Sequence, residues 1–350
     1  MRMTAEEKKK IIRAAWLREN GRTVPFFSEA GENLKATREL LSAPERDLAR
    51  QEQLIEASLG SEDYSLPSLK PNLGIGVMAI AFGCPYVLDE SADPWVKPII
   101  TDANPEDVSH LQLPDPRKSG LFPQALARID FFNERGRFPL RCVNIPSPLL
   151  TASLVWEYGS FLAALLMSPR QVHLLLEKIT AATLDFLRVE RERIRSLFAY
   201  THESVYIPAD LALRVSDDVA AVLTGELYRE FGVRYNNALA EEYGGLVVHS
   251  CGNISRSLPA MMETKNLLGI DLVAPQNDLS LVKEITRGRT ALCLRYFDWD
   301  FPTGTEVRLL EYGQRLVELF GAQGILLWTH TPTVEEARRL SRAMRRACEG

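Results

Sequence analysis

The chain has 350 residues, of which 46% are hydrophobic and 25% charged, a balance that excludes collagen-like and mostly disordered proteins. Lys and Arg total 41 against 46 for Asp and Glu, so the formal net charge is −5, opposite to the bias of a general nucleic-acid binder. Five cysteines are too few for a disulfide scaffold, and no apolar signal core or continuous membrane segment stands out, so we expect a cytoplasmic protein with free thiols and no membrane partner.

The amino-terminal third is predicted to be a helical elaboration. An amphipathic helix over 4–20 precedes a short strand at 23–27, and residues 33–60 are predicted to be helical. Residues 61–120 are punctuated by proline and are expected to contain one further strand. We therefore expect an extension of the main fold here, not a separate domain.

From residue 121 onward, helical and strand patterns alternate regularly. The predicted strands are 138–144, 204–209, 245–250, 270–275, 289–296 and 324–329. The predicted helices are 121–135, 151–167, 169–196, 224–243, 255–264, 279–287, 305–321 and 333–347.

This alternation implies parallel strands, and the nearly continuous apolar character of the strands indicates a sheet buried on both faces. With the strands at 23–27 and within 61–120, the total is eight. The pattern predicts a (β/α)8 TIM barrel with an amino-terminal helical extension, one domain spanning 1–350. An open doubly wound sheet is the alternative, but no nucleotide-binding glycine motif follows any strand.

The sequence His249-Ser250-Cys251 closes an apolar strand. Side chains two residues apart on a strand point to the same side, so His249 and Cys251 are expected to converge at the carboxyl end, where barrel enzymes place their active sites. An imidazole and a thiolate together are half of a zinc site. The alternative is a hydrogen-bonded core histidine beside an inert cysteine.

A third metal ligand would have to come from the end of another strand. His330 follows the last predicted strand, whereas Cys293 lies within its own strand and His202 precedes one. The predicted metal set is therefore His249, Cys251 and His330, with a fourth position open to water or substrate, as is typical of catalytic zinc.

Other strand ends carry polar residues that would face the same mouth. Asn144, Ser147 and Asn277 are candidate substrate-binding residues, and Asp210 and Tyr296 are candidate catalytic residues. Helix capping is the alternative explanation for Asn277, as it is for Asp217 and Asp218.

Two long segments resemble a known protein family. The stretches 146–180 (PSPLLTASLVWEYGSFLAALLMSPRQVHLLLEKIT) and 203–253, which ends in GGLVVHSCGN, resemble the uroporphyrinogen decarboxylase superfamily. The opening residues and the final GILLWTHTPTVEEARRL resemble it as well. The resemblance implies a (β/α)8 barrel and one of two reactions, decarboxylation of porphyrinogen acetates or zinc-dependent methyl transfer from a corrinoid to a thiol.

The decarboxylase motif is degraded in this chain. Members that decarboxylate porphyrinogens carry RQAGR after the first strand, where this chain has Ser28-Glu29-Ala30-Gly31-Glu32. Neither Ser28 nor Glu32 can rebuild a bidentate arginine contact with a carboxylate. The stretch 71–83, which should supply an aspartate, contains no acid and offers only Asn72. We predict that the protein does not decarboxylate uroporphyrinogen.

The methyltransferase branch is the better match. His249 and Cys251 correspond to its His-x-Cys pair, but the distant third cysteine is replaced by Thr329 or His330. The resemblance implies zinc, a small-molecule acceptor such as a thiol, and methylcobalamin or another corrinoid carried by a partner protein. Two alternatives stay open: a decarboxylase or lyase acting on a small carboxylated substrate through Asp210 and Tyr296, and a non-catalytic binding protein. Homo-oligomerisation is also left open.

Overall fold

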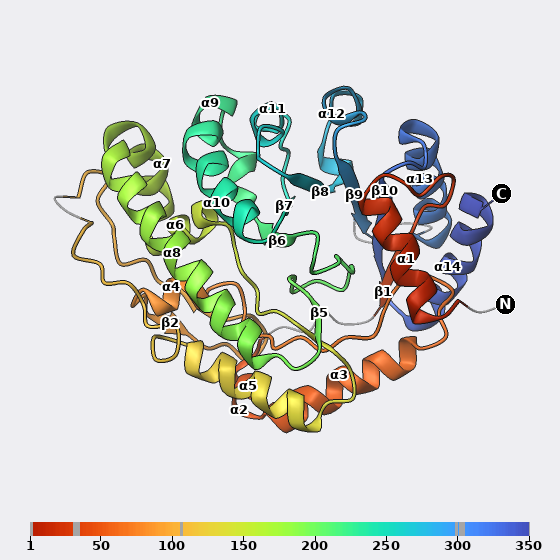
Figure 1. The fold of residues 1–350 in the computed structure, drawn as a ribbon, viewed down its shortest axis with the longest axis horizontal. Helices are drawn as coiled ribbons and strands as arrows, with labels where there is room; N and C mark the ends of the chain where they lie inside the picture. Colours follow the sequence, from red (N-terminus) through yellow and green to blue (C-terminus); the bar gives the residue numbers. More distant parts are fainter. Residues whose placement is uncertain (1–2, 31–35, 106–107, 298–299, 301–304, 350) are drawn as a thin grey trace.

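A computed structural model describes residues 3–30, 36–105, 108–297, 300 and 305–349 of the chain. Its centre is a six-stranded parallel sheet in the order β1-β10-β9-β8-β7-β6 (Figure 1). These strands, taken along the chain, are β1 Phe26–Ala30, β6 Leu213–Ser216, β7 Leu246–Ser250, β8 Leu267–Val273, β9 Ala291–Phe297 and β10 Ile325–Thr331.

Shorter segments complete the ring between β6 and β1. The strand β5 (Leu197–Ala199) lies between β6 and β4 (Leu140–Arg141), and an isolated parallel bridge joins β4 to Leu69. The Tyr64 N–H donates to the Phe26 carbonyl of β1 at 2.9 Å. The sheet thus curves back onto its first strand, which confirms the predicted TIM barrel, and the strand expected within 61–120 is the extended segment around Leu69.

Helices surround the strands on the outside (Figure 1). The helices of the amino-terminal extension are α1 Ala5–Trp16, α2 Arg38–Ser42, α3 Pro44–Ser58 and α4 Val77–Ala81, and α5 Phe122–Arg135 begins the regular part of the chain. The later helices are α6 Pro148–Val155, α7 Tyr158–Met167, α8 Pro169–Arg193, α9 Gly225–Tyr228, α10 Arg234–Glu242, α11 Leu258–Met261, α12 Leu279–Thr286, α13 Thr305–Phe320 and α14 Val334–Glu349. A two-stranded antiparallel pair, β2 Tyr86–Val87 and β3 Trp95–Val96, lies apart from the barrel. No described helix is both long and apolar enough to span a bilayer.

Strand alternation separates an inner from an outer face of the barrel. The amino-terminal part of the interior is apolar and includes Val247, Ala291 and Leu326, which belong to one buried cluster with Trp16 of α1. Trp16 lies so close to Gly269 of β8 that a Cβ there would come within 2.4 Å of its ring. The helix α1 therefore seals the amino-terminal side, and polar groups occupy the carboxyl-terminal side of the interior.

One predicted strand is wrong. Residues 204–209 form irregular structure and a turn, and the chain instead forms β5 before them and β6 after them. The residues SVYIPA favour a strand, but here Val205 and Ile207 are buried beside α1 in irregular structure. The first strand also lies three residues later than predicted, and the helix predicted over 33–60 breaks before Pro44.

Candidate functional site

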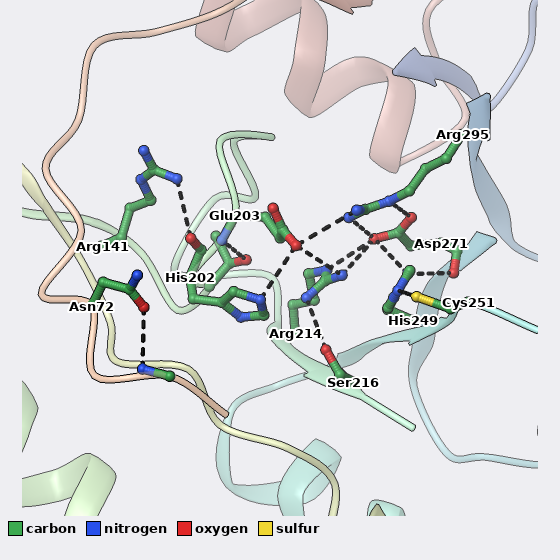
Figure 2. A network of polar contacts seen from close by, with 12 residues as sticks. Asn72, Arg141, His202, Glu203, Arg214, Ser216, His249, Cys251, Asp271 and Arg295 are labelled. Carbon is green, nitrogen blue, oxygen red and sulfur yellow. Dashed lines mark hydrogen bonds and ion pairs between the residues drawn. The ribbon is translucent and has the colours of Figure 1, made fainter. Parts of the chain in front are cut away.

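The His-x-Cys pair lies at the carboxyl end of β7, as predicted. His249 is buried, with 5% of its surface exposed, and its Nε2 lies 3.1 Å from the sulfur of Cys251 (Figure 2). Both side chains line the central cavity of the barrel. The two-residue spacing on a strand therefore directs both groups to one point.

A carboxylate completes this cluster. Asp218 offers an oxygen that lies, with the ligand atoms of His249 and Cys251, in a group whose members are all within 4.8 Å of one another. Its Oδ1 also accepts a hydrogen bond from the Cys251 N–H at 2.7 Å. Asp218 follows β6, the neighbour of β7, and opens a short 3-10 turn (Asp218–Ala221).

His330 is not the third member of this cluster among the described residues. It lies on β10, which pairs with β1 and β9, so two strands separate it from β7. It does line the same cavity. The prediction of His330 as the third ligand considered which strand ends reach the mouth but not which strands are neighbours.

The other nitrogen of His249 is held by β8. Its Nδ1 lies 3.1 Å from the backbone carbonyl of Asp271 and 3.3 Å from a carboxylate oxygen of the same residue. Donation of the Nδ1 proton to Asp271 leaves Nε2 as the acceptor that faces Cys251. This second interaction is the one that typically orients a metal-binding histidine and selects its tautomer.

Asp271 belongs to a buried network of charges (Figure 2). Its carboxylate accepts from Arg214 at 2.9 Å and from Arg295, and both arginines also approach Glu203, at 3.8 and 3.5 Å. Glu203 contacts His202 at 3.3 Å. Burial alone would raise the pKa of Asp271, but the positive charges around it outweigh burial and hold that pKa far below its usual value.

The protonation states of the pair suit a metal site. Burial lowers the pKa of His249, so the imidazole is neutral near pH 7 and keeps a lone pair for a cation. Desolvation and the nearby Asp218 carboxylate raise the pKa of Cys251 to about 12, so its thiol is protonated unless a cation offsets these effects. Nitrogen, sulfur and carboxylate oxygen are all donors that zinc accepts, so the residues present fit that ion.

The cluster opens into a cavity of about 850 Å³. Asn144, predicted to bind substrate, lines this cavity, whereas the side chains of Ser147 and Asn277 form hydrogen bonds with backbone groups. Ser147 is fully buried and caps α6 by accepting from the Leu150 N–H. Asn277 accepts from the Ile254 N–H at 2.9 Å and donates to the carbonyls of Gly252 and Val273, which holds the loop after Cys251 against the end of β8.

The two predicted catalytic residues lie outside this cavity. Asp210 is exposed and pairs with Arg13 of α1 at 2.8 Å, because the strand assumed to end at Asp210 does not exist. Tyr296 is fully buried on the outer face of β9, where its ring lies 5.4 Å from that of Tyr312. Its neighbour Arg295 points inward instead. Neither Asp210 nor Tyr296 is positioned for acid–base catalysis at the mouth.

Sequence reasoning missed the residues of the charged network. Three charged residues of the network each lie in a mostly apolar strand, at a position whose side chain points into the barrel. They are Arg214 in LRVS, Asp271 in LLGIDLV and Arg295 in ALCLRYF. A buried charge seldom occurs unless it is paired, so these isolated charges were a usable signal. His202, set aside because it precedes a predicted strand, also lines the cavity.

The degraded decarboxylase motif is also visible in the structure. Ser28 donates to the Asp63 carboxylate through its hydroxyl, at 2.5 Å, and through its backbone N–H, at 2.9 Å. Glu29 faces the cavity. Glu32 lies outside the described residues.

Comparison with known proteins agrees with this architecture. A family model described as uroporphyrinogen decarboxylase (URO-D) matches residues 7–193, more than half of the chain. A solved methyltransferase from Methanosarcina mazei is 18% identical, has a TM-score of 0.69 and covers 98% of each chain, which indicates a shared fold. A B12-independent methionine synthase from a Shewanella species is 12% identical with a TM-score of 0.47, over 93% of this chain and 96% of that one. No curated protein matches the sequence. With a barrel of this kind and a family match over residues 7–193, the chain belongs to the uroporphyrinogen decarboxylase (URO-D) family.

Proposed function

We propose that this protein is a zinc-dependent methyltransferase that moves a methyl group between a corrinoid and a thiol or similar acceptor. The observation that carries the proposal is the convergence of His249, Cys251 and Asp218 at the carboxyl end of the barrel, with Asp271 behind the histidine. Three protein donors with room for a fourth ligand are typical of catalytic zinc sites.

The reaction requires an acceptor that is nucleophilic at neutral pH. Zinc bound to these residues would lower the pKa of an acceptor thiol, as metals do for coordinated thiols. The thiol proton would pass to solvent, the methyl group would move from the donor corrinoid to the acceptor sulfur, and the electron pair of the broken cobalt–carbon bond would remain with the donor. The cavity orients the acceptor, and Asn144, which lines it, is a candidate contact. The resemblance noted in the sequence supports a donor corrinoid carried by a partner protein.

The lyase alternative has less support. It relied on Asp210 and Tyr296 as acid and base, and both lie away from the cavity. Porphyrinogen decarboxylation is disfavoured further by Ser28, which is hydrogen-bonded to Asp63 where the motif of that reaction has an arginine.

The metal content of purified protein tests the proposal. We expect about one zinc per chain in the wild type and loss of most zinc in His249→Ala, Cys251→Ala and Asp218→Ala. Cys293→Ala and Asp210→Ala are matched controls, because Cys293 belongs to the apolar cluster of the barrel interior and Asp210 is on the surface. Both should keep the metal.

His330→Ala separates the two ligand sets and should also keep the metal. Transfer from methylcobalamin to small thiols should then follow zinc content across the variants. A wild-type protein that takes up no zinc, or a Cys251→Ala variant that retains it fully, would contradict the proposal.

A further inference from the structure

Two cations in the cavity have no paired carboxylate among the described residues. Arg141, at the end of β4, and Lys70 both line it. Among the residues that the structure describes, the Arg141 guanidinium donates to the backbone carbonyls of His202, at 3.1 Å, and Ser68, at 3.3 Å, and its buried Nε has no hydrogen-bond partner there. Within the described part of the chain, neither cation has a carboxylate oxygen within 4.0 Å.

The other buried cations of the barrel are neutralised. Arg214 and Arg295 share Asp271 and lie near Glu203. Glu29 also lines the cavity, but burial and the negative charge of Glu203 raise its pKa, which disfavours its ionised form. Burial lowers the pKa of both Arg141 and Lys70, and the carboxylates of Glu203 and Glu29, which lie more than 4.0 Å away, offset this effect only in part. A charge removed from water without a counter-charge is costly, so this part of the cavity is built to receive an anion.

Arg141 lies away from the metal-ligand cluster, and its charge acts on Lys70. Figure 2 shows Arg141 at the opposite end of the polar network from Cys251, with its guanidinium hydrogen-bonded to the His202 carbonyl. Hydrogen bonds and ion pairs connect Arg141 with Cys251 through the network residues His202, Glu203, Arg295, Asp271 and His249. A ligand that reaches both ends must carry its anionic group some distance from its reacting atom.

We propose that Arg141 and Lys70 bind an oxyanion group, such as a carboxylate, sulfonate or phosphate, on the molecule whose reacting atom lies at His249, Cys251 and Asp218. The identity of this molecule as the methyl acceptor rests on the proposed function. Anion binding itself does not require the metal.

Calorimetric titration of EDTA-treated full-length protein tests the anion site. The ligands are propionate, ethanesulfonate and inorganic phosphate, with propionamide as the neutral comparator. We expect at least one of the three anions to bind and propionamide not to bind. Arg141→Gln and Lys70→Met should each weaken binding by about ten- to hundredfold, because each removes a charge-assisted contact. Arg141→Lys should retain part of the affinity, because the charge stays while the planar fork is lost.

The matched control is Arg137→Gln, which removes an exposed arginine that pairs with Glu52 and Glu56 at the surface. It should bind anions like the wild type. Melting temperature and near-UV circular dichroism check the fold of each variant, and Lys70→Met carries the test if Arg141→Gln does not fold. Equal binding of propionate and propionamide, no binding of any of the three anions, or unchanged affinity in folded Arg141→Gln or Lys70→Met would overturn the proposal.

A second titration separates this proposal from the metal site. With zinc-loaded protein, 3-mercaptopropionate should bind more tightly than 3-mercaptopropan-1-ol, and Arg141→Gln should remove that preference. His249→Ala should lose zinc yet bind propionate normally. If the wild type takes up no zinc but its propionate binding still depends on Arg141, the anion site stands and the metal role fails. If zinc binds but no anion does, the reverse holds.

Discussion

Asp271→Asn tests the charged network beneath the metal ligands. Asp271 is 2% exposed and is the shared partner of Arg214, Arg295 and His249. The substitution keeps the size of the side chain but removes its negative charge. Both arginines, themselves 2% and 4% exposed, would then lie in the interior with only Glu203 to offset them.

The expected loss of stability is large because the remaining charges cannot reach water. Removal of one partner from a buried ion pair typically costs about 3–5 kcal/mol of unfolding free energy. Asp210→Asn makes the same chemical change at a surface pair, in which Asp210 and Arg13 have 65% and 41% of their side chains exposed. Exposed pairs contribute about 0–1 kcal/mol, so the two variants should differ by roughly 3 kcal/mol.

Urea unfolding at pH 7 measures this difference, and its pH dependence gives a second check. The folded-state pKa of Asp271 is depressed, so its contribution is present above the unfolded-state pKa of about 3.9 and is lost as the pH falls below it. The stability gap between wild type and Asp271→Asn should therefore narrow below about pH 4. A variant as stable as Asp210→Asn at pH 7, or a gap that stays constant in acid, would refute the reasoning.

Three further outcomes are expected. Burial raises the pKa of Glu190 to about 8, so its contribution to stability is complete below about pH 4 and is lost as the pH rises to 8. Urea unfolding at several pH values should therefore show Glu190→Gln gaining stability relative to the wild type, by ~1.4 kcal/mol per pH unit across that window. A Cβ at Gly313 would lie 2.4 Å from the Tyr296 hydroxyl oxygen and 2.8 Å from the Met344 methyl, so Gly313→Ala should lower the unfolding free energy by about 1–3 kcal/mol while zinc content is unchanged; a neutral effect would place Tyr296 elsewhere. Incubation with uroporphyrinogen should form no coproporphyrinogen above a control without enzyme, and product formation would show that the altered motif around Ser28 still supports decarboxylation.

The alternation of helical and strand patterns was sufficient to predict the barrel. This signal is local, because a parallel strand buried on both faces must be apolar and must be followed by a crossover, usually a helix, that returns the chain to the same edge. Six of the predicted strands overlap β1, β4, β7, β8, β9 and β10. The strand predicted at 204–209 is wrong because the prediction uses the same local pattern. A short apolar run that is buried in irregular structure has the sequence pattern of a strand.

The His249–Cys251 pair was also predictable, because its geometry depends only on the two-residue repeat of a single strand. Relations between strands were not predictable in the same way. Asp218 joins the pair because β6 is the neighbour of β7, while β8 and β9 separate β7 from His330 on β10.

On β9, the choice between an inward Arg295 and an inward Tyr296 depends on register, since every residue of that strand is buried and either parity is compatible with its composition. The sequence by itself therefore determined the periodicity of each element and the side chains that share a face within it. Only the tertiary structure decided which strands lie side by side and which faces point inward, because both depend on contacts between residues far apart in the chain.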